Sequence, residues 1–263
     1  MSPGSLQGSP YNQPTLFIGQ HVVRLAEVDS TNTFAMSLLR GADIAEGTVV
    51  AARNQTSGRG QRGNSWFSEP GKNITCSIVL RPTFLEAPCQ FDLTRAVALG
   101  ITDLLLTLLP ATPVHIKWPN DIIAGNKKIC GVLIENALNG LQLSTSVIGI
   151  GLNLNQADFG SDAPRAVSLF HLTGHELDPE ETMKHLFAAI EARYLQLRGN
   201  KTELLRNEYE ARLYRKGVPA RYTDFKTIFD ATLEQVTPEG LLVLRDTAGN
   251  ERKFGFKEVG MLG

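Results

Sequence analysis

The sequence has few cysteines, no long hydrophobic run and almost no net charge. Cys76, Cys89 and Cys130 show neither metal-ligand spacing nor a disulfide framework, which favours a reducing compartment. No apolar run approaches the roughly 18 residues that span a bilayer, and the first residues carry no signal-peptide pattern. We therefore expect a cytoplasmic protein with no membrane partner. The net charge of −1 gives no global attraction to nucleic acids, so no nucleic-acid partner is expected.

What remains is the composition of an ordinary globular protein. The 263 residues, 42% hydrophobic and 20% charged, suffice for one large domain with or without a small one. The start, MSPGSLQGSPYNQP, is rich in glycine, serine and proline, which favours disorder. From Gly217 on, short alternating segments are separated by the turn signals VTPEG and DTAGN. We expect a disordered segment over residues 1–20, a large domain over 21–214 and a small all-β domain over 215–263.

Helix and strand patterns are mixed within the large domain. Apolar spacing predicts helices in EVDSTNTFAMSLLR, FDLTRAVALGITDLLLTLLP, DPEETMKHLFAAIEARYLQLR and residues 201–213. Strand patterns occur after Gly47, in NITCSIVLRP, in VHIKWPNDII, in KKICGVLIENAL and in LSTSVIGIGLNLN. The third and fourth of these strands are joined by AGN, which predicts a hairpin.

Residues 58–63 read GRGQRG, the G-x-G-x-x-G spacing of a dinucleotide-binding turn. In such a turn the glycines lie between a strand and a helix, whose N-terminus holds the pyrophosphate. Here the following NSWFSEPGKN contains Pro70-Gly71, which prevents a helix, and a strand pattern begins ten residues after Gly63. The context is strand, loop, strand. The motif therefore does not indicate a dinucleotide-binding fold.

Two interpretations of this glycine loop remain. It is either a surface loop that tolerates glycine, or a loop whose backbone amides wrap around an anion. Arg59 and Arg62 favour the second, because guanidinium groups pair with phosphate or carboxylate oxygens. Trp66 can stack on a base or cover a site. We expect a ligand-binding loop that becomes ordered when its ligand arrives.

Five segments resemble, in order and spacing, the biotin protein ligases. They are STNTFA, QTSGRGQRGNSWFS, KWPNDI, KKICGVLIE and IGIGLNLN, and the similarity is clear over residues 20–160. The chain is similar to the short form of that family, biotin–[acetyl-CoA-carboxylase] ligase. The resemblance implies an α+β fold: a mixed, largely antiparallel central sheet flanked by helices, as in class II synthetases, and a small C-terminal β-barrel like that of Src-homology-3 domains.

The resemblance also implies a two-step reaction. Such a ligase makes biotinyl-5′-AMP from biotin and ATP, and then transfers biotin to one lysine of a biotin carboxyl carrier protein. The first step brings together a carboxylate and a triphosphate, whose repulsion cationic groups and Mg²⁺ must offset. ATP and biotin are substrates and Mg²⁺ is an activator, so no tightly bound cofactor is expected. A homodimer and a monomer both remain open.

By this resemblance, Lys128 contacts the biotin carboxylate and the α-phosphate. The alternative is an ordinary exposed lysine like Lys127, and the family register favours Lys128. In VHIKW, Lys117 lies on the strand face opposite Trp118, directed either at the phosphates or at solvent. Arg59 is the third cationic side chain for which the resemblance implies a catalytic role, beside Lys128 and Lys117.

The dipeptide Asn120-Asp121 follows a proline, where a turn is expected in any case. The resemblance places Asp121 near Mg²⁺ or beside Lys128, and Asn120 near phosphate. Asn153, in a GLN turn, is implied to face the adenosine. Residues expected at ATP or the adenylate are Arg59, Arg62, Trp66, Lys117, Asn120 and Asn153.

Biotin needs a mostly apolar slot with polar groups for its ureido ring. The resemblance assigns to biotin Ser30, Thr31, Asn32, Gln55, Arg59, Gly60, Gln61, Lys128 and Gly131. Helix capping is the alternative for Ser30 and Thr31. Gly131 would let the backbone approach the ligand closely. Many bacterial members have arginine where this chain has Gln61, which puts a role for a charged side chain there in doubt, although backbone contacts would persist.

Three other functions compete with this interpretation. A lipoate or octanoyl transferase would lack the paired GRGxRG and KWPND motifs. A transcriptional repressor would need an N-terminal helix-turn-helix domain, and about 20 residues precede the catalytic pattern. A non-catalytic biotin-binding module has no use for Lys128 and Asp121. We therefore expect an enzyme only.

Overall fold

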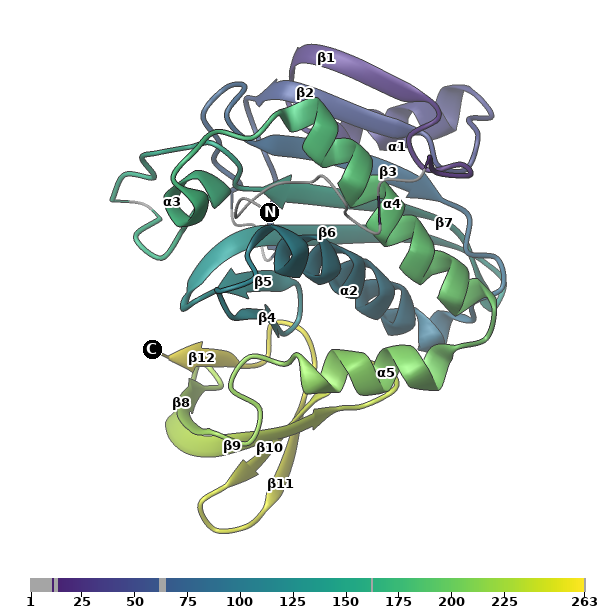
Figure 1. Ribbon diagram of the computed structural model, residues 1–263. Coiled ribbons are helices and arrows are strands. Elements are labelled where there is room, and N and C mark those ends of the chain that lie inside the picture. Colours follow the sequence, from purple (N-terminus) through teal and green to yellow (C-terminus); the bar gives the residue numbers. More distant parts are fainter. Residues whose placement is uncertain (1–10, 12–13, 62–64, 162, 263) are drawn as a thin grey trace.

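The computed structural model describes residues 11, 14–61, 65–161 and 163–262, and they form two β-sheets with helices packed around the larger one (Figure 1). The larger sheet has seven strands in the order β1-β2-β3-β7-β6-β5-β4. Only β1 and β2 pair in parallel among these neighbours; the other pairs are antiparallel. The mixed, largely antiparallel sheet predicted from the sequence is confirmed.

The strands of the large sheet are β1 (Val22–Val28), β2 (Val49–Gln55), β3 (Ile74–Leu80), β4 (Val114–Lys117), β5 (Asp121–Ala124), β6 (Lys127–Asn139) and β7 (Gln142–Leu152). One prediction was wrong, because the expected strand VHIKWPNDII is two strands. Pro119 has no N–H to donate, and the chain turns there so that Lys117 pairs with Asp121. The hairpin through Gly125 joins β5 to β6, as expected.

The helices are α1 (Thr31–Gly41), α2 (Phe91–Leu108), α3 (Leu169–Thr173), α4 (Pro179–Arg198) and α5 (Thr202–Ala211). Alternate residues of the inner strands face opposite sides of the sheet. Val50, Val79 and Val147 form a small buried cluster with Ala35 of α1. The other face packs against α2 and α4, and the described helices include none long and apolar enough to cross a membrane.

Residues 14–20 are anchored by a carboxylate of α4. The backbone N–H groups of Leu16, Phe17 and Ile18 all donate to the Glu191 carboxylate at 2.6–2.9 Å, and Ile18 is fully buried. The expectation of disorder over residues 1–20 is therefore wrong for this part, because the sequence gives no sign that a distant glutamate accepts three hydrogen bonds from it. Residues 1–10, 12 and 13 lie outside the described residues.

Substituting Glu191→Ala is expected to lower the free energy of unfolding by about 2–4 kcal/mol, because it removes a 4% exposed carboxylate that accepts three backbone hydrogen bonds. Urea denaturation measures the change. The matched control is Glu180→Ala on the same helix, whose exposed pair with Arg24 contributes roughly 0–1 kcal/mol. Equal effects of the two substitutions would contradict the anchoring role.

The second sheet is entirely antiparallel, in the order β11-β10-β9-β8-β12. Its strands are β8 (Pro219–Thr223), β9 (Ile228–Val236), β10 (Leu242–Asp246), β11 (Glu251–Phe254) and β12 (Gly260–Leu262). It forms the small C-terminal barrel-like unit that was predicted, and it lies beside β4 and α5 (Figure 1).

The turn between β9 and β10 is tied to the large sheet. Arg95 of α2 is 1% exposed and donates to the carbonyl oxygens of Val236 and Pro238, at 3.2 and 3.0 Å. Trp118 Nε1 donates to the carbonyl oxygen of Gly240 at 3.0 Å. This turn is therefore held in place next to the loop between β4 and β5.

Candidate active site

A cavity of about 280 Å³ lies at the ends of the central strands, between the two sheets. Many of the predicted site residues line it: Ser30, Thr31, Asn32, Gln55, Arg59, Gly60, Gln61, Trp66, Lys117, Asn120, Asp121, Lys128 and Gly131. They come from the start of α1, the end of β2, the glycine loop, and strands β4 to β6. Arg62 lies outside the described residues.

One end of the cavity is a hydrogen-bonded polar wall. The backbone N–H of Thr31 donates to Gln55 Oε1 at 2.8 Å, and the Thr31 hydroxyl donates to the same oxygen at 3.1 Å. Ser77 Oγ, fully buried on β3, lies 2.8 Å from Thr31 Oγ1 and 2.6 Å from Asn32 Oδ1. These contacts hold the side chains in fixed orientations. Ser77 was not predicted from the sequence.

The wall continues to the glycine loop through Glu135, which was not predicted either. Asn32 Nδ2 donates to Glu135 Oε2 at 2.8 Å, and Arg59 donates to Glu135 Oε1 at 3.3 Å. Asn32 lies directly over Gly149 of β7: a Cβ there would stand 2.4 Å from Asn32 Oδ1. Ser30 is the N-cap residue of α1, but its side chain makes no capping hydrogen bond. Helix capping therefore does not explain why a hydroxyl side chain stands at this position.

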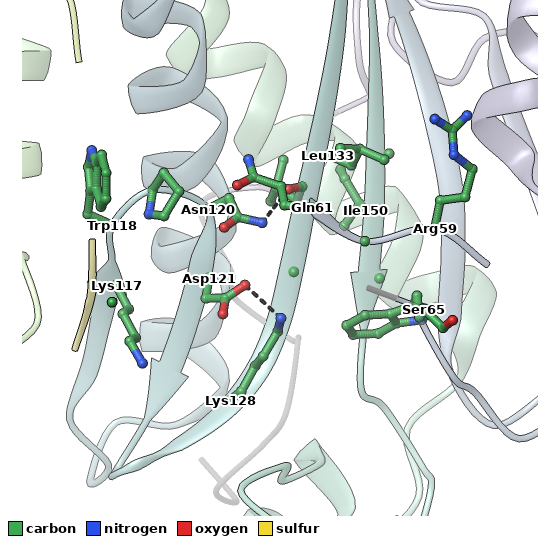
Figure 2. Close-up of a pocket in the computed structure, with 18 of the residues that line it drawn as sticks. Arg59, Gln61, Ser65, Lys117, Trp118, Asn120, Asp121, Lys128, Leu133 and Ile150 are labelled. Carbon is green, nitrogen blue, oxygen red and sulfur yellow. Dashed lines mark hydrogen bonds and ion pairs between the residues drawn. The ribbon is translucent and has the colours of Figure 1, made fainter. Parts of the chain in front are cut away.

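The other end of the cavity is cationic. Lys128 Nζ forms an ion pair with Asp121 Oδ1 at 2.7 Å, and Figure 2 shows Asp121 between Lys117 and Lys128. Burial lowers the pKa of Lys117 below its usual value; Asp121 opposes this, and the nearby cations Arg165, Lys128 and Arg215 add to it. Such a cluster of positive charge attracts a polyanion.

Glycines give the cavity its floor. The Trp66 ring covers Gly131 and Gly151, where an added Cβ would lie 3.1 and 2.3 Å from ring carbons. Lys128 Nζ is 5.7 Å from the centre of the same ring. The cavity is thus closed on this side by an aromatic ring that a flat ligand can replace or stack on. The role of Gly151 was missed, because a glycine within a strand has several explanations.

Asn153 and Cys130 are both buried next to the cavity-lining strands. Asn153 is 3% exposed and is not among the residues that line the cavity; its Nδ2 donates to the carbonyl oxygens of Val167 and Lys128, at 3.0 and 3.4 Å. In this structure the Asn153 side chain supports the Lys128 strand, and the expectation that it faces the adenosine stays a prediction. Cys130 is fully buried, and burial raises the pKa of its thiol, which suits packing better than nucleophilic chemistry.

The donor set fits Mg²⁺ only in part. Asp121 is the one carboxylate among the described residues that line the cavity, and no group of three or more His, Cys, Asp or Glu side chains in the described ranges could hold a metal. Mg²⁺ commonly takes one or two carboxylates and completes its shell with phosphates and water. The cavity therefore suits a metal that arrives with a nucleotide.

The chain is similar to proteins of known activity. The model of the biotin/lipoate A/B protein ligase family matches residues 25–153. The biotin–[acetyl-CoA-carboxylase] ligase of Paracoccus denitrificans is 35% identical over 232 residues, which cover 86% of this chain and 95% of that protein. The bifunctional ligase/repressor BirA of Bacillus subtilis is 30% identical over 260 residues, which cover 96% of this chain and 78% of that protein.

A solved structure shares the fold. The biotin protein ligase from Aquifex aeolicus in complex with biotin and ATP superposes with a TM-score of 0.77 at 24% identity, over 92% of this chain and 99% of that one. At that identity the likeness concerns the fold alone. Both sheets described above fall within the shared architecture.

Proposed function

The chain belongs to the biotin protein ligases of the biotin/lipoate A/B protein ligase family, and we propose how its residues perform that activity. The enzyme uses ATP to activate biotin as biotinyl-5′-AMP and transfers biotin to a lysine of a biotin carboxyl carrier protein. The observation that supports our assignment is a single cavity with a hydrogen-bonded polar wall at one end and two lysines, Lys117 and Lys128, at the other.

Biotin lies with its ureido ring against the polar wall. Thr31, Asn32 and Gln55 offer both donors and acceptors there, as a urea group requires, and Ser30 stands at the same helix start. Ser77 and Glu135 position them. The tetrahydrothiophene ring and valeryl chain run along the strand glycines, beside Asn32 over Gly149 and beside Trp66 over Gly131.

Lys128 acts where the two substrates meet. One carboxylate oxygen of biotin attacks the α-phosphorus of ATP, a bond forms between them, and the bond to the bridging oxygen of pyrophosphate breaks. Lys128 balances the negative charge that accumulates on the reacting oxygens. Asp121 holds the lysine ammonium 2.7 Å away, which orients it towards the cavity. The reaction needs no covalent enzyme intermediate.

Lys117 supplies further positive charge for the phosphates. Arg59, which contacts Glu135 in this structure, would exchange that partner for the phosphates, together with Arg62 from the same loop. Asp121 is the residue that would hold Mg²⁺, which when bound neutralises part of the triphosphate charge. Gly60, Gln61, Asn120 and Trp66 surround the adenylate and keep water from the mixed anhydride.

The test is an isotope exchange between pyrophosphate and ATP. We expect exchange with biotin and ATP, and little without biotin, because the enzyme must form the acyl adenylate reversibly. Equal exchange with lipoate in place of biotin would overturn the assignment of biotin. Absence of exchange with either acid would overturn the reaction itself.

Lys117→Arg is expected to change the pH dependence of the first step. Because the pKa of Lys117 is lowered, its positive charge is lost at a lower pH than that of an ordinary lysine, so kcat/KM for ATP falls on the alkaline side. Arginine stays charged throughout, so the fall should move to higher pH. Steady-state exchange kinetics across pH measure it. An unchanged alkaline limb would contradict a role for this charge at the phosphates.

A further inference from the structure

We infer that a second cavity, beside the first, admits the carrier lysine that attacks biotinyl-5′-AMP; this inference rests on the proposed function. The second cavity, here called the lysine channel, measures about 340 Å³. It lies between the N-terminal end of α2, the outer half of β6 and the turn between β9 and β10. Gln61, Pro119, Asn120 and Val132 line both cavities, so the two adjoin.

The wall that separates the two cavities is only one pair of residues thick, and that pair is Asn120 and Val132. Asp121 of β5 pairs with Gly131 of β6, and Asn120, just before Asp121, lies opposite Val132, just after Gly131. Asn120 Nδ2 donates to the carbonyl oxygen of Val132 at 2.8 Å, and the backbone N–H of Val132 donates to that of Asn120 at 2.9 Å. Gln61 and Asn120 line both cavities, and Figure 2 shows Gln61 on the side of Asn120 away from Lys128. A nucleophile at this wall therefore stands next to the acyl group at Lys128.

The two cavities differ in charge. The first is lined by Arg59, Lys117 and Lys128 against one carboxylate, Asp121, and would repel an incoming ammonium group. The described lining of the lysine channel contains neither lysine nor arginine, and its one carboxylate is the exposed Glu239. Anions thus enter one cavity, and a cationic side chain fits the other.

The walls of the lysine channel suit the rest of a lysine side chain. Phe91, Ile134 and Phe256 offer apolar surface for its methylene groups, in the way that lysine stems pack elsewhere while their charge stays near polar groups. Amide side chains, among them Asn120, offer acceptors deeper in the channel. The carboxylate of Glu239 at the mouth and the amide acceptors deeper in the channel together guide the amine towards the mixed anhydride.

Glu239 is held at the mouth by a rigid turn. Gly240 next to it has φ +96°, and any Cβ there would stand 2.6 Å from the Phe91 ring. Arg95 and Trp118 bind the carbonyl oxygens of this turn, as described above. The same Trp118 precedes the shared wall, so the small sheet fixes the channel mouth relative to the site of transfer.

The lysine ammonium loses one proton to solvent, and the neutral nitrogen attacks the acyl carbon of biotinyl-5′-AMP. A C–N bond forms while the bond from the acyl carbon to the phosphate oxygen breaks, and AMP leaves with that oxygen. The second proton is lost from nitrogen to solvent as the amide forms.

The test separates the two half-reactions. With Glu239→Lys, we expect the KM for a biotin carboxyl carrier domain to rise about tenfold, while biotin-dependent pyrophosphate exchange stays at the parent rate. Glu239→Gln should give a smaller rise. Asp230→Lys is the matched control: it makes the same charge change on β9, at a residue that lines neither cavity. A mainly electrostatic effect should also weaken as salt is added.

A second nucleophile distinguishes an effect of charge on the carrier lysine from a general structural change in the protein. Hydroxylamine, which is largely uncharged near neutral pH, also traps an acyl adenylate, and Glu239→Lys should leave its rate unchanged. The inference fails if Glu239→Lys and Asp230→Lys raise the carrier KM equally, if neither raises it, or if trapping by hydroxylamine slows as much as transfer. Absence of exchange in the parent protein would instead refute the proposed function.

Discussion

Substituting Lys128→Ala is expected to slow biotin-dependent pyrophosphate exchange by about 10²- to 10³-fold, the effect of removing one charge-stabilising donor from a transition state. The ammonium group lies in the cavity, 2.7 Å from Asp121, where the biotin carboxylate meets the α-phosphate in our assignment. The loss should appear in kcat, because the charge that Lys128 balances develops as the bond forms. Steady-state exchange kinetics measure it.

The variant should fold, since the Lys128 side chain is 36% exposed and its removal leaves Asp121 at the edge of an open cavity. A change of about 1–2 kcal/mol in the free energy of unfolding is expected. Lys127→Ala is the matched control: it is the adjacent, exposed lysine, outside the cavity, and should keep the parent rate. Parent-like exchange by Lys128→Ala would remove this residue from the mechanism.

Substituting Gly149→Ala is expected to weaken biotin binding by about 2–3 kcal/mol, or roughly 30- to 150-fold in Kd. The new Cβ would stand 2.4 Å from Asn32 Oδ1, so the carboxamide must move. Movement breaks its contacts with Ser77 and Glu135 and disorders the polar wall. Equilibrium binding of biotin, measured by calorimetry, gives the change.

The matched control is Gly41→Ala at the end of α1, where an added Cβ meets no atom within 4 Å and alanine favours the helix. Its biotin affinity should equal that of the parent. Parent-like biotin binding by Gly149→Ala would mean that the ureido ring does not lie against Asn32.

Much of the fold follows from local signals. Regular apolar spacing over FDLTRAVALGITDLLLTLLP and DPEETMKHLFAAIEARYLQLR predicts α2 and α4, and Asp178 accepts a hydrogen bond from the backbone N–H of Glu181 as an N-cap should. The break between β4 and β5 was predicted only in part: a turn was expected after Pro119, but the strand pattern continues across it, and only the pairing of Lys117 with Asp121 shows that two strands meet there.

In the candidate site, too, some residues could be predicted from the sequence and others could not. Thr31, Gln55 and Lys128 stand in or beside the short motifs that carry the family resemblance, so the sequence singles them out through that resemblance. Ser77 looks like any outward-facing residue of an alternating strand, and it is buried only because the start of α1 packs over it. The contacts of Asn153 could not be predicted, because a turn residue gives no sign of the carbonyl groups that its side chain reaches.

The most direct test of the central claim, that one cavity brings biotin and nucleotide together at Lys128, is a crystal structure with a stable biotinyl-5′-AMP analogue. We predict the ureido ring beside Thr31 and Asn32, and the phosphate within hydrogen-bonding distance of Lys128 Nζ. An analogue bound outside this cavity, or bound with its phosphate away from Lys128 and Arg59, would contradict it.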